Sequence, residues 1–342
     1  MKSAGRVLFL TVGGAQIGLG HVKRCLALAQ ALASEGADIA FVLSPDPDVA
    51  RIVERSGFPV IQRAWESGPS AACAVVSELG ADVVIVDAYV ARTEHFQALR
   101  HLAAQLVAID DTAERRLPVD VVVNVGAGTE AVPYRVPAGT TLLLGSRYAL
   151  VDPAYAKPPA RIYGTRVERV LVTLGGSVHP EALRAVVAAV DAVFEGACLH
   201  VVVGPFGNAA AIDGAARPGR NRVTTHGHVP GLGPLMLDAD LAVTGAGVTL
   251  YELAATATPA VMVMTEPNQA RNVAAFESAG AALFAGPASA PDLGARLRTA
   301  VTRLAGDRSV RAALGAAGRL LVDGQGAIRV ARELASMPGA RR

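Results

Sequence analysis

The sequence is poor in cysteine, in aromatic residues and in long apolar runs. Its three cysteines, Cys25, Cys73 and Cys198, are widely spaced and form no C-x-x-C pair. This pattern argues against a disulfide framework and favours a reduced, cytoplasmic compartment. No apolar stretch approaches the ~20 residues of a membrane span, so no integral membrane segment is expected. Aromatic residues make up only 4% of the chain, so its cores must consist mainly of Ala, Val and Leu.

The sequence also has little excess charge and none of the common catalytic signatures. The formal net charge is +2, and no basic run is interleaved with aromatic residues, so a nucleic-acid partner is not expected. The chain contains no G-x-S-x-G elbow, no Walker A loop and no H-E-x-x-H helix. No set of Asp and His residues has the spacing of metal ligands, so no metal is expected.

What the chain does have is a regular alternation of short apolar runs with longer amphipathic ones. Runs rich in Val, Ile and Leu that are separated by helical patterns predict parallel sheets covered on both faces. We expect α/β architecture built from these strands: 6–12, 38–44, 59–63, 82–88, 105–111, 120–126, 140–145, 169–176, 198–204, 222–229, 241–247, 259–265 and 281–286.

A proline-rich segment, 152–166, interrupts this alternation. We therefore expect two doubly wound, Rossmann-like domains, residues 1–151 and residues 167–342, joined by that linker. In open α/β sheets ligands bind beyond the carboxyl ends of the strands. With two such domains, the cleft between them is the expected active site, and the loops that follow strands matter most.

The stretch IGLGHVKRC follows the first strand and opens a helix. It is not a dinucleotide fingerprint, because the third glycine position after Gly18 and Gly20 is occupied by Lys23. His21 falls at the start of the helix, where the positive helix end disfavours imidazolium and keeps the ring able to act as a base. A histidine that only caps the loop is the alternative, and the loop alone does not decide between the two.

The stretch VTGAGVTLYE in the second domain again predicts a strand, a glycine turn and a helix. Gly245, Gly247 and the first helical residue, Val248, would offer free N–H groups to a diphosphate. Glu252 lies about one turn further on. Its carboxylate could accept both hydroxyls of a ribose, or could simply favour the helix dipole.

Other strand ends supply further candidates. The turn LGGS suits close approach of a phosphate, and the backbone of THGHVP could recognise the edge of a base. Two amides at a helix start in TEPNQARN could bind a sugar or could be helix caps. The residues concerned are Gly175, Gly176, Ser177, Val229, Asn268 and Gln269.

Acidic residues end two strands of the first domain. Asp87 and Tyr89 come from VDAY, and Asp110 and Asp111 come from IDD. Paired acids on one loop could bind a metal, but without other ligands at suitable spacing the pair 110–111 is expected to be a solvated, helix-capping pair.

Taken together, these segments resemble the PseG-type hydrolases of UDP-2,4-diacetamido-2,4,6-trideoxy-β-L-altropyranose, which act in pseudaminic acid biosynthesis. IGLGHVKRCLALAQAL is similar to the family signature G-x-G-H-x-x-R-[CD]-x-x-L-A, which related spore-coat polysaccharide proteins share. VIVDAYV, AIDDTAERRLPVDVVVN and LLLGSRYALVDPAY resemble further first-domain motifs. VLVTLGGS, GAGVTLYELAATATPAVMV and NQARNVAAFESAGAA resemble second-domain motifs.

The resemblance implies the GT-B architecture of MurG-like glycosyltransferases, with water as the acceptor. It implies that His21 is the catalytic histidine and that Tyr89, Glu252, Asn268 and Gln269 line the nucleotide-sugar site. The implied activity is inverting, metal-independent hydrolysis of a UDP-sugar, without a cofactor. It would serve surface polysaccharides such as those of flagellin glycosylation. The oligomeric state is left open, and a monomer is compatible with the sequence.

Two departures from the family pattern bear on function. The usual R-x-D-x-S stretch before the glycine loop is replaced by TVGGAQ, residues 11–16, and Tyr251 precedes Glu252 where a tryptophan often stands. The first departure affects the expected sugar contacts. A UDP-sugar-dependent glycosyltransferase acting on a glycan or lipid carrier, and a non-catalytic nucleotide-sugar binding protein, therefore remain as alternatives.

Overall fold

The computed structural model describes residues 5–175, 180–227, 229 and 231–337, and these residues form two compact units. One unit takes the chain up to Pro153 together with the stretch that begins at Gln325. The other runs from Ala154 to Gly324. The boundary at 153–154 lies within the segment predicted as a linker. Among the described residues, no helix combines the length and apolarity that crossing a membrane requires.

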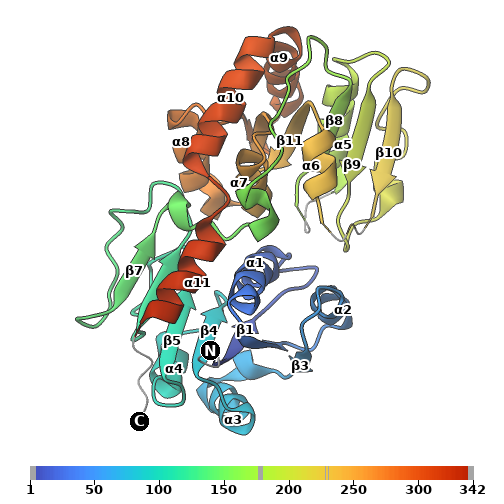
Figure 1. Ribbon diagram of the computed structural model, residues 1–342. Helices are drawn as coiled ribbons and strands as arrows, with labels where there is room; N and C mark the ends of the chain where they lie inside the picture. Colours follow the sequence, from blue (N-terminus) through green and yellow to red (C-terminus); the bar gives the residue numbers. More distant parts are fainter. Residues whose placement is uncertain (1–4, 176–179, 228, 230, 338–342) are drawn as a thin grey trace. The chain divides into compact units, whose positions relative to one another are not determined.

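The first unit is a parallel sheet in the strand order β3-β2-β1-β4-β5-β6-β7 (Figure 1). The order reverses direction between β1 and β4, which pair through Thr11 and Asp87 at their carboxyl ends. That reversal is the point at which doubly wound sheets bind ligands. The strands are β1 (Arg6–Thr11), β2 (Asp38–Leu43), β3 (Val60–Gln62), β4 (Val83–Asp87), β5 (Gln105–Ile109), β6 (Val121–Asn124) and β7 (Thr141–Leu144).

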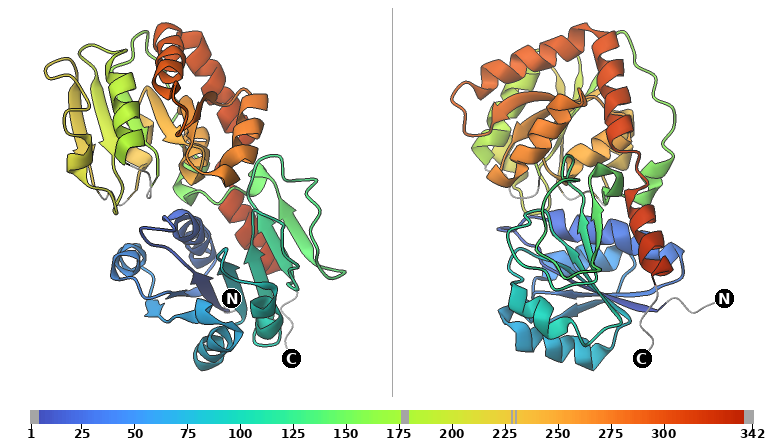
Figure 2. Two further views of the ribbon diagram at one scale, coloured as in Figure 1. Left: turned by 180° about the vertical axis from the view of Figure 1, so that it is seen from behind. Right: turned by 90° about the vertical axis from the view of Figure 1, so that its left-hand side faces the viewer.

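Helices cover both faces of this sheet, as the continuous apolar strands predicted. Figure 2 shows α3 and α4 on one face and α1 and α11 on the other. Alternate residues of β1 divide between the faces, with Leu8 and Leu10 packing in one core with Phe96 and Leu99 of α4. The helices are α1 (Gly20–Ser34), α2 (Pro47–Arg55), α3 (Pro69–Leu79), α4 (Thr93–Leu99) and α11 (Gly326–Ser336).

The second unit repeats the design, with strand order β10-β9-β8-β11-β12-β13. Helices α5 and α9 share one core with the sheet, while α7 and α8 lie on the opposite face. The strands are β8 (Arg169–Thr173), β9 (Cys198–Val202), β10 (Arg222–His226), β11 (Leu241–Gly245), β12 (Ala260–Met264) and β13 (Leu283–Pro287). The helices are α5 (Pro180–Asp191), α6 (Gly233–Asp238), α7 (Val248–Ala255), α8 (Ala270–Ser278), α9 (Leu293–Gly306) and α10 (Arg308–Leu321).

The last helix, α11, corrects the predicted domain boundaries. The sequence predicted that residues 167–342 form the second domain, but α11 groups with the first unit. Its apolar face, including Val330 and Leu334, is buried, and the helix packs beside α1 (Figure 1). Gly326 permits this return, because a Cβ atom there would lie 2.3 Å from the carbonyl oxygen of Ala149.

The predicted linker is not a flexible connection, because side chains within it hydrogen-bond the backbone of the second unit. Arg161 donates to the carbonyl oxygens of Met236 and Ala239 at 2.7 and 2.6 Å. Tyr163 donates to the carbonyl oxygen of Ala257 at 2.8 Å. This part of the segment is therefore fixed to the second unit by hydrogen bonds to the ends of its helices.

Candidate active site

The glycine loop after β1 places His21 in the first turn of α1. Backbone hydrogen bonds close the loop, from Gly14 N to Gly18 O at 3.2 Å and from Gly18 N to Gly14 O at 2.7 Å. Gly18 has a φ of +80°, a conformation that strongly favours glycine. Gly20 then begins the helix. The glycines of the signature therefore form a tight turn that fixes where the next residue, His21, begins.

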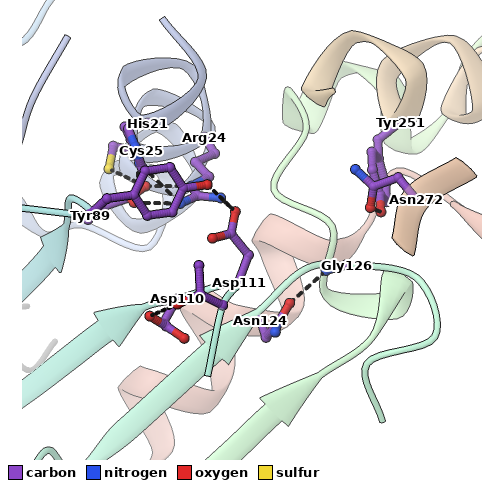
Figure 3. A network of polar contacts seen from close by, with 12 residues as sticks. His21, Arg24, Cys25, Tyr89, Asp110, Asp111, Asn124, Gly126, Tyr251 and Asn272 are labelled. Atoms are coloured by element: carbon purple, nitrogen blue, oxygen red, sulfur yellow. Dashed lines mark hydrogen bonds and ion pairs between the residues drawn. The ribbon is translucent and has the colours of Figure 1, made fainter. Parts of the chain in front are cut away.

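Helical spacing explains the rest of the signature. Positions i, i+3 and i+4 of a helix share one face. The side chains of His21, Arg24 and Cys25, which Figure 3 shows gathered near Tyr89, all contact the carboxylate of Asp87 at the end of β4. His21 Nδ1 lies 2.6 Å from Asp87 Oδ1. Arg24 donates from Nε to Oδ2 and from Nη2 to Oδ1, both at 2.6 Å. The Cys25 thiol lies 3.5 Å from Oδ2.

Asp87 is completely buried but remains ionised. Burial alone raises the pKa of a carboxyl group. Here the charge of Arg24, together with the hydrogen bonds from Arg24 and His21, outweighs burial and holds the pKa of Asp87 well below its usual range. Burial would lower the pKa of Arg24, but Asp87 and Asp111 raise it well above the usual value. The buried pair is therefore a carboxylate and a guanidinium.

The ionised state of Asp87 determines which nitrogen of His21 is basic. A carboxylate only accepts hydrogen bonds, so Nδ1 of His21 must carry the proton in the 2.6 Å contact. Arg24 Nη2, at 3.1 Å from Nδ1, is also a donor, so that approach is not a hydrogen bond. The lone pair lies on Nε2, which no described residue hydrogen-bonds. His21 is thus oriented as a base.

Tyr89 and Asp111 complete the polar network. The Tyr89 ring meets the His21 ring edge-on, with centroids 4.6 Å apart, and its hydroxyl donates to Asp111 Oδ2 at 3.0 Å. Arg24 Nη1 binds the same oxygen at 2.9 Å. Burial raises the pKa of Asp111. The charge and hydrogen bond of Arg24 outweigh this effect, so the pKa of Asp111 lies below its usual value. Arg24 therefore links the histidine side of the site to the tyrosine side.

A second arginine holds the loop that carries Tyr89. Arg115 Nη1 donates to the carbonyl oxygens of Ala88, Tyr89 and Ala91 at 3.2, 3.0 and 2.5 Å. Its Nη2 pairs with Asp110 Oδ1 at 3.0 Å. The loops after β4 and β5 are therefore joined by one guanidinium, a contact that nothing in the local sequence around residue 115 signals.

The prediction that Asp110 and Asp111 form a solvated, helix-capping pair is wrong. Asp110 is 1% exposed and accepts the N–H of Ala113 at 2.7 Å, while Asp111 binds Arg24 and Tyr89. The physical reason is that an arginine neutralises each carboxylate: Arg115, five residues further along the chain, pairs with Asp110, and the distant Arg24 pairs with Asp111. Within the described ranges, no group of three or more His, Cys, Asp or Glu side chains could hold a metal ion.

The ion pairs around Arg24 give a prediction for acid stability. A carboxyl whose pKa is lowered by folding stabilises the protein above its unfolded pKa of about 4, and this stabilisation is lost as the pH falls through the folded pKa. We expect the free energy of unfolding to fall below about pH 4, and Asp111→Asn to reduce that dependence. Urea unfolding across this pH range measures both. Identical pH dependence in the variant would contradict an ionised, stabilising Asp111.

In the second unit, β11 ends at Gly245 and α7 begins at Val248, so the predicted order of strand, glycine turn and helix is present. A Cβ atom at Gly245 would lie 2.6 Å from the carbonyl oxygen of Leu174, so the strand end needs glycine. Gly247 is the N-cap of α7, which begins at Val248, and no side chain in the described part of the chain caps this helix. Its first N–H groups are therefore not used by a capping residue.

The amide candidates after β12 differ from one another. Gln269 is a local cap: its Oε1 accepts the N–H of Thr265 at 2.9 Å, and its Nε2 donates to the Thr265 hydroxyl at 3.0 Å. The same Nε2 lies 3.6 Å from where a Cβ of Gly247 would stand, beside the glycine turn. Asn268 is exposed, and Glu252 is half-buried one turn into α7. Their roles toward a ligand stay predictions.

The remaining candidates are only partly described. Gly175 is exposed and has a φ of +115°, and Val229 is half-buried. Gly176 and Ser177 lie outside the described residues. Sequence reasoning missed Arg24, Arg115 and the role of Asp87. The i, i+3 spacing of His21 and Arg24, together with an acidic residue that ends an apolar strand, was the available signal for the first and last of these.

Comparison with known proteins supports the sequence resemblance. Residues 170–316 match the glycosyltransferase family 28 C-terminal domain. A Helicobacter pylori protein named pseudaminic acid cytidylyltransferase and UDP-2,4-diacetamido-2,4,6-trideoxy-beta-L-altropyranose hydrolase is 26% identical over 77% of this chain and 45% of its own. The spore coat polysaccharide biosynthesis protein SpsG of Bacillus subtilis is 25% identical over 93% of this chain and 94% of its own.

A third relative, an uncharacterized protein of Methanocaldococcus jannaschii, is 24% identical over 75% of this chain and 55% of its own. The chain thus spans about half the length of this relative and of the Helicobacter pylori protein. The match to SpsG, in contrast, extends over nearly the whole of both chains.

Solved structures show the fold. MurG of Acinetobacter baumannii superposes with a TM-score of 0.66 at 17% identity, over 97% of this chain and 99% of its own. The Streptomyces sp. glycosyltransferase SsfS6, solved with thymidine diphosphate, superposes with a TM-score of 0.62 at 15% identity. The match covers 97% of this chain and 100% of SsfS6. The chain therefore has the GT-B fold and is a relative of the PseG-type hydrolases and of SpsG, as its sequence motifs predicted.

Proposed function

We propose that this protein hydrolyses a UDP-linked diacetamido-trideoxyhexose to UDP and the free sugar, with inversion and without a metal. The observation that carries the proposal is the buried His21–Asp87 pair, which leaves Nε2 of His21 as a base at the start of α1. The similarity to a relative named as such a hydrolase supports the substrate class. The activity belongs to cytoplasmic, pseudaminic-acid-type nonulosonate biosynthesis for surface polysaccharides, flagellin glycosylation included.

In the proposed mechanism, water attacks the anomeric carbon while His21 Nε2 removes its proton. The bond from this carbon to the diphosphate oxygen breaks, and its electron pair leaves with UDP. The imidazolium that forms is stabilised by the carboxylate of Asp87 through Nδ1. General base catalysis of this kind contributes about 10²–10⁴-fold. UDP is a good leaving group, so the step needs no strong general acid.

Residues of the second unit are proposed to bind UDP. The uncapped start of α7, with Gly245, Gly247 and Val248, suits the diphosphate, because free N–H groups and the helix dipole favour anions. Glu252 is proposed to accept the ribose hydroxyls. Gly175, Gly176 and Ser177 are candidates for a second phosphate contact, and Val229 for the uracil edge. Tyr89, Gly18, Gly20, Asn268 and Gln269 are proposed to contact the sugar or its phosphates.

A glycosyltransferase is the second candidate, and two observations favour it. The match over 170–316 is to a glycosyltransferase domain, and the loop 11–16 lacks the charged residues of the hydrolase pattern. In that reaction an acceptor hydroxyl replaces water at His21. A non-catalytic binding protein is a weaker alternative, since it would not need a buried carboxylate that orients His21.

The deciding experiment is UDP release from UDP-2,4-diacetamido-2,4,6-trideoxy-β-L-altropyranose with EDTA and without acceptor, with His21→Ala measured in parallel. Release by the wild type alone supports a metal-independent hydrolase. No release, with UDP still bound, supports the transferase and directs attention to residues 11–16. No release and no UDP binding would contradict the proposal altogether.

Glu252→Ala tests the ribose assignment. We expect UDP affinity to fall about 10- to 100-fold, because hydrogen bonds to a charged group contribute roughly 1.5–3 kcal/mol. Isothermal titration with UDP measures the loss, and Glu277→Ala, an exposed acid on α8, is a control that should bind normally. Unchanged UDP affinity in Glu252→Ala would refute the assignment and leave Glu252 as a helix N-terminal acid.

A further inference from the structure

Asn272 on α8 makes two short hydrogen bonds that reach the glycine turn and the helix after it. Its Nδ2 donates to the carbonyl oxygen of Ala246 at 2.9 Å. Its Oδ1 accepts the hydroxyl of Tyr251, on α7, at 2.6 Å. Figure 3 shows the amide of Asn272 facing the phenol of Tyr251. We refer to these two side chains as the Tyr251–Asn272 clamp.

Packing holds the clamp in one arrangement. Tyr251 is 5% exposed and meets the ring of Phe276 edge-on, with centroids 5.1 Å apart. Phe276 is completely buried. Rings in this geometry have little rotational freedom, so the Tyr251 hydroxyl is fixed and in turn fixes which end of the Asn272 amide donates.

The clamp controls the direction of one backbone N–H group. In a planar trans peptide, the carbonyl of one residue and the N–H of the next point in opposite directions. Asn272 holds the carbonyl of Ala246 toward α8, so the N–H of Gly247 points away from α8. On its other side Ala246 is held as well, because its own N–H donates to Val263 O on β12 at 3.1 Å.

We propose that Tyr251 and Asn272 are positioning residues that aim the Gly247 N–H, at the uncapped start of α7, toward the diphosphate of the bound nucleotide. The inference rests on the proposed binding of UDP by the second unit. Both polar atoms of the Asn272 amide are engaged within the protein, so the residue acts through the turn rather than on the ligand. The clamp therefore serves the diphosphate and not the nucleoside.

The test compares UDP with uridine, which lacks phosphates. Tyr251→Phe removes only the hydroxyl that orients Asn272, so UDP affinity should fall about three- to tenfold, the effect of one hydrogen bond, with uridine affinity unchanged. Asn272→Ala should lose at least as much UDP affinity. The double variant should lose no more than Asn272→Ala, because the two residues act as one unit.

Tyr163→Phe is the matched control, because it also removes a phenol that donates to a backbone carbonyl in the second unit, at Ala257 just beyond α7. It should bind UDP normally. Additive losses in the double variant, equal losses for UDP and uridine, or unchanged UDP affinity in Tyr251→Phe and Asn272→Ala would overturn the inference alone. Failure of the wild type to bind UDP would overturn the proposed function and the inference with it.

Discussion

His21→Ala should reduce turnover of the UDP-sugar by at least about 10²–10⁴-fold while leaving UDP affinity nearly unchanged. The imidazole supplies the base, whereas the proposed nucleotide contacts come from the second unit. His21 is only 5% exposed, so the small alanine side chain leaves a local cavity beside Asp87. The carboxylate of Asp87 stays paired with Arg24, so the substitution leaves no buried charge without a partner. Single-turnover kinetics together with UDP titration separate the chemical step from binding.

His101→Ala is the control for this variant, because His101 is exposed in the same unit and its removal should leave turnover intact. Thermal unfolding would show whether His21→Ala keeps the fold. Parallel losses of turnover and UDP affinity would instead mean that His21 has a structural role. Full retention of turnover would remove the histidine from the mechanism.

The sheets could be predicted from the sequence because their signal is local. Short continuous runs rich in Val and Ile, such as DVVIVDA, favour a strand buried on both faces, and the structure has β4 at that place. The glycine turns could also be predicted from the sequence. Gly18 is needed because its φ is positive, and Gly245 because a side chain there would collide with a neighbouring backbone.

Helix α11 was assigned to the wrong unit because an amphipathic pattern shows that a helix has an apolar face but not which sheet covers it. Its buried residues, such as Val330, would suit either domain by sequence alone. Only the backbone path, with Gly326 close to Ala149, decides that it packs in the first unit.

The candidate site was predictable in position but not in connectivity. A strand end gave Tyr89 and the start of a helix gave His21 as site candidates, whereas Asp87 and Asp111 were recognised only as acids at strand ends. Their joining through Arg24 depends on side-chain directions across two sheet strands and a helix, which no local pattern encodes. For the same reason, the sequence predicted solvated carboxylates at 110–111, whereas in the structure arginine side chains neutralise both of them.

Asp87→Asn should lower kcat about 10²–10⁴-fold with little change in UDP affinity, because it removes the acceptor that selects the tautomer of His21. Among the described residues, each side-chain group that hydrogen-bonds the Asp87 carboxylate is a donor. These groups are His21 Nδ1, the Arg24 guanidinium and the Cys25 thiol. An asparagine must turn its NH₂ group toward one of them. Facing His21, it favours the tautomer with the proton on Nε2, and the base is lost.

Asp111→Asn separates this effect from a simple change of charge. It removes one negative charge beside Arg24, as Asp87→Asn does, but it leaves the His21–Asp87 contact in place. We therefore expect a much smaller loss of kcat in Asp111→Asn under the same assay. If the two variants lose kcat equally, the charge around Arg24 governs the rate. If only Asp87→Asn loses it, the carboxylate acts through the proton on Nδ1, and Arg24 serves to keep that carboxylate ionised in a fully buried position.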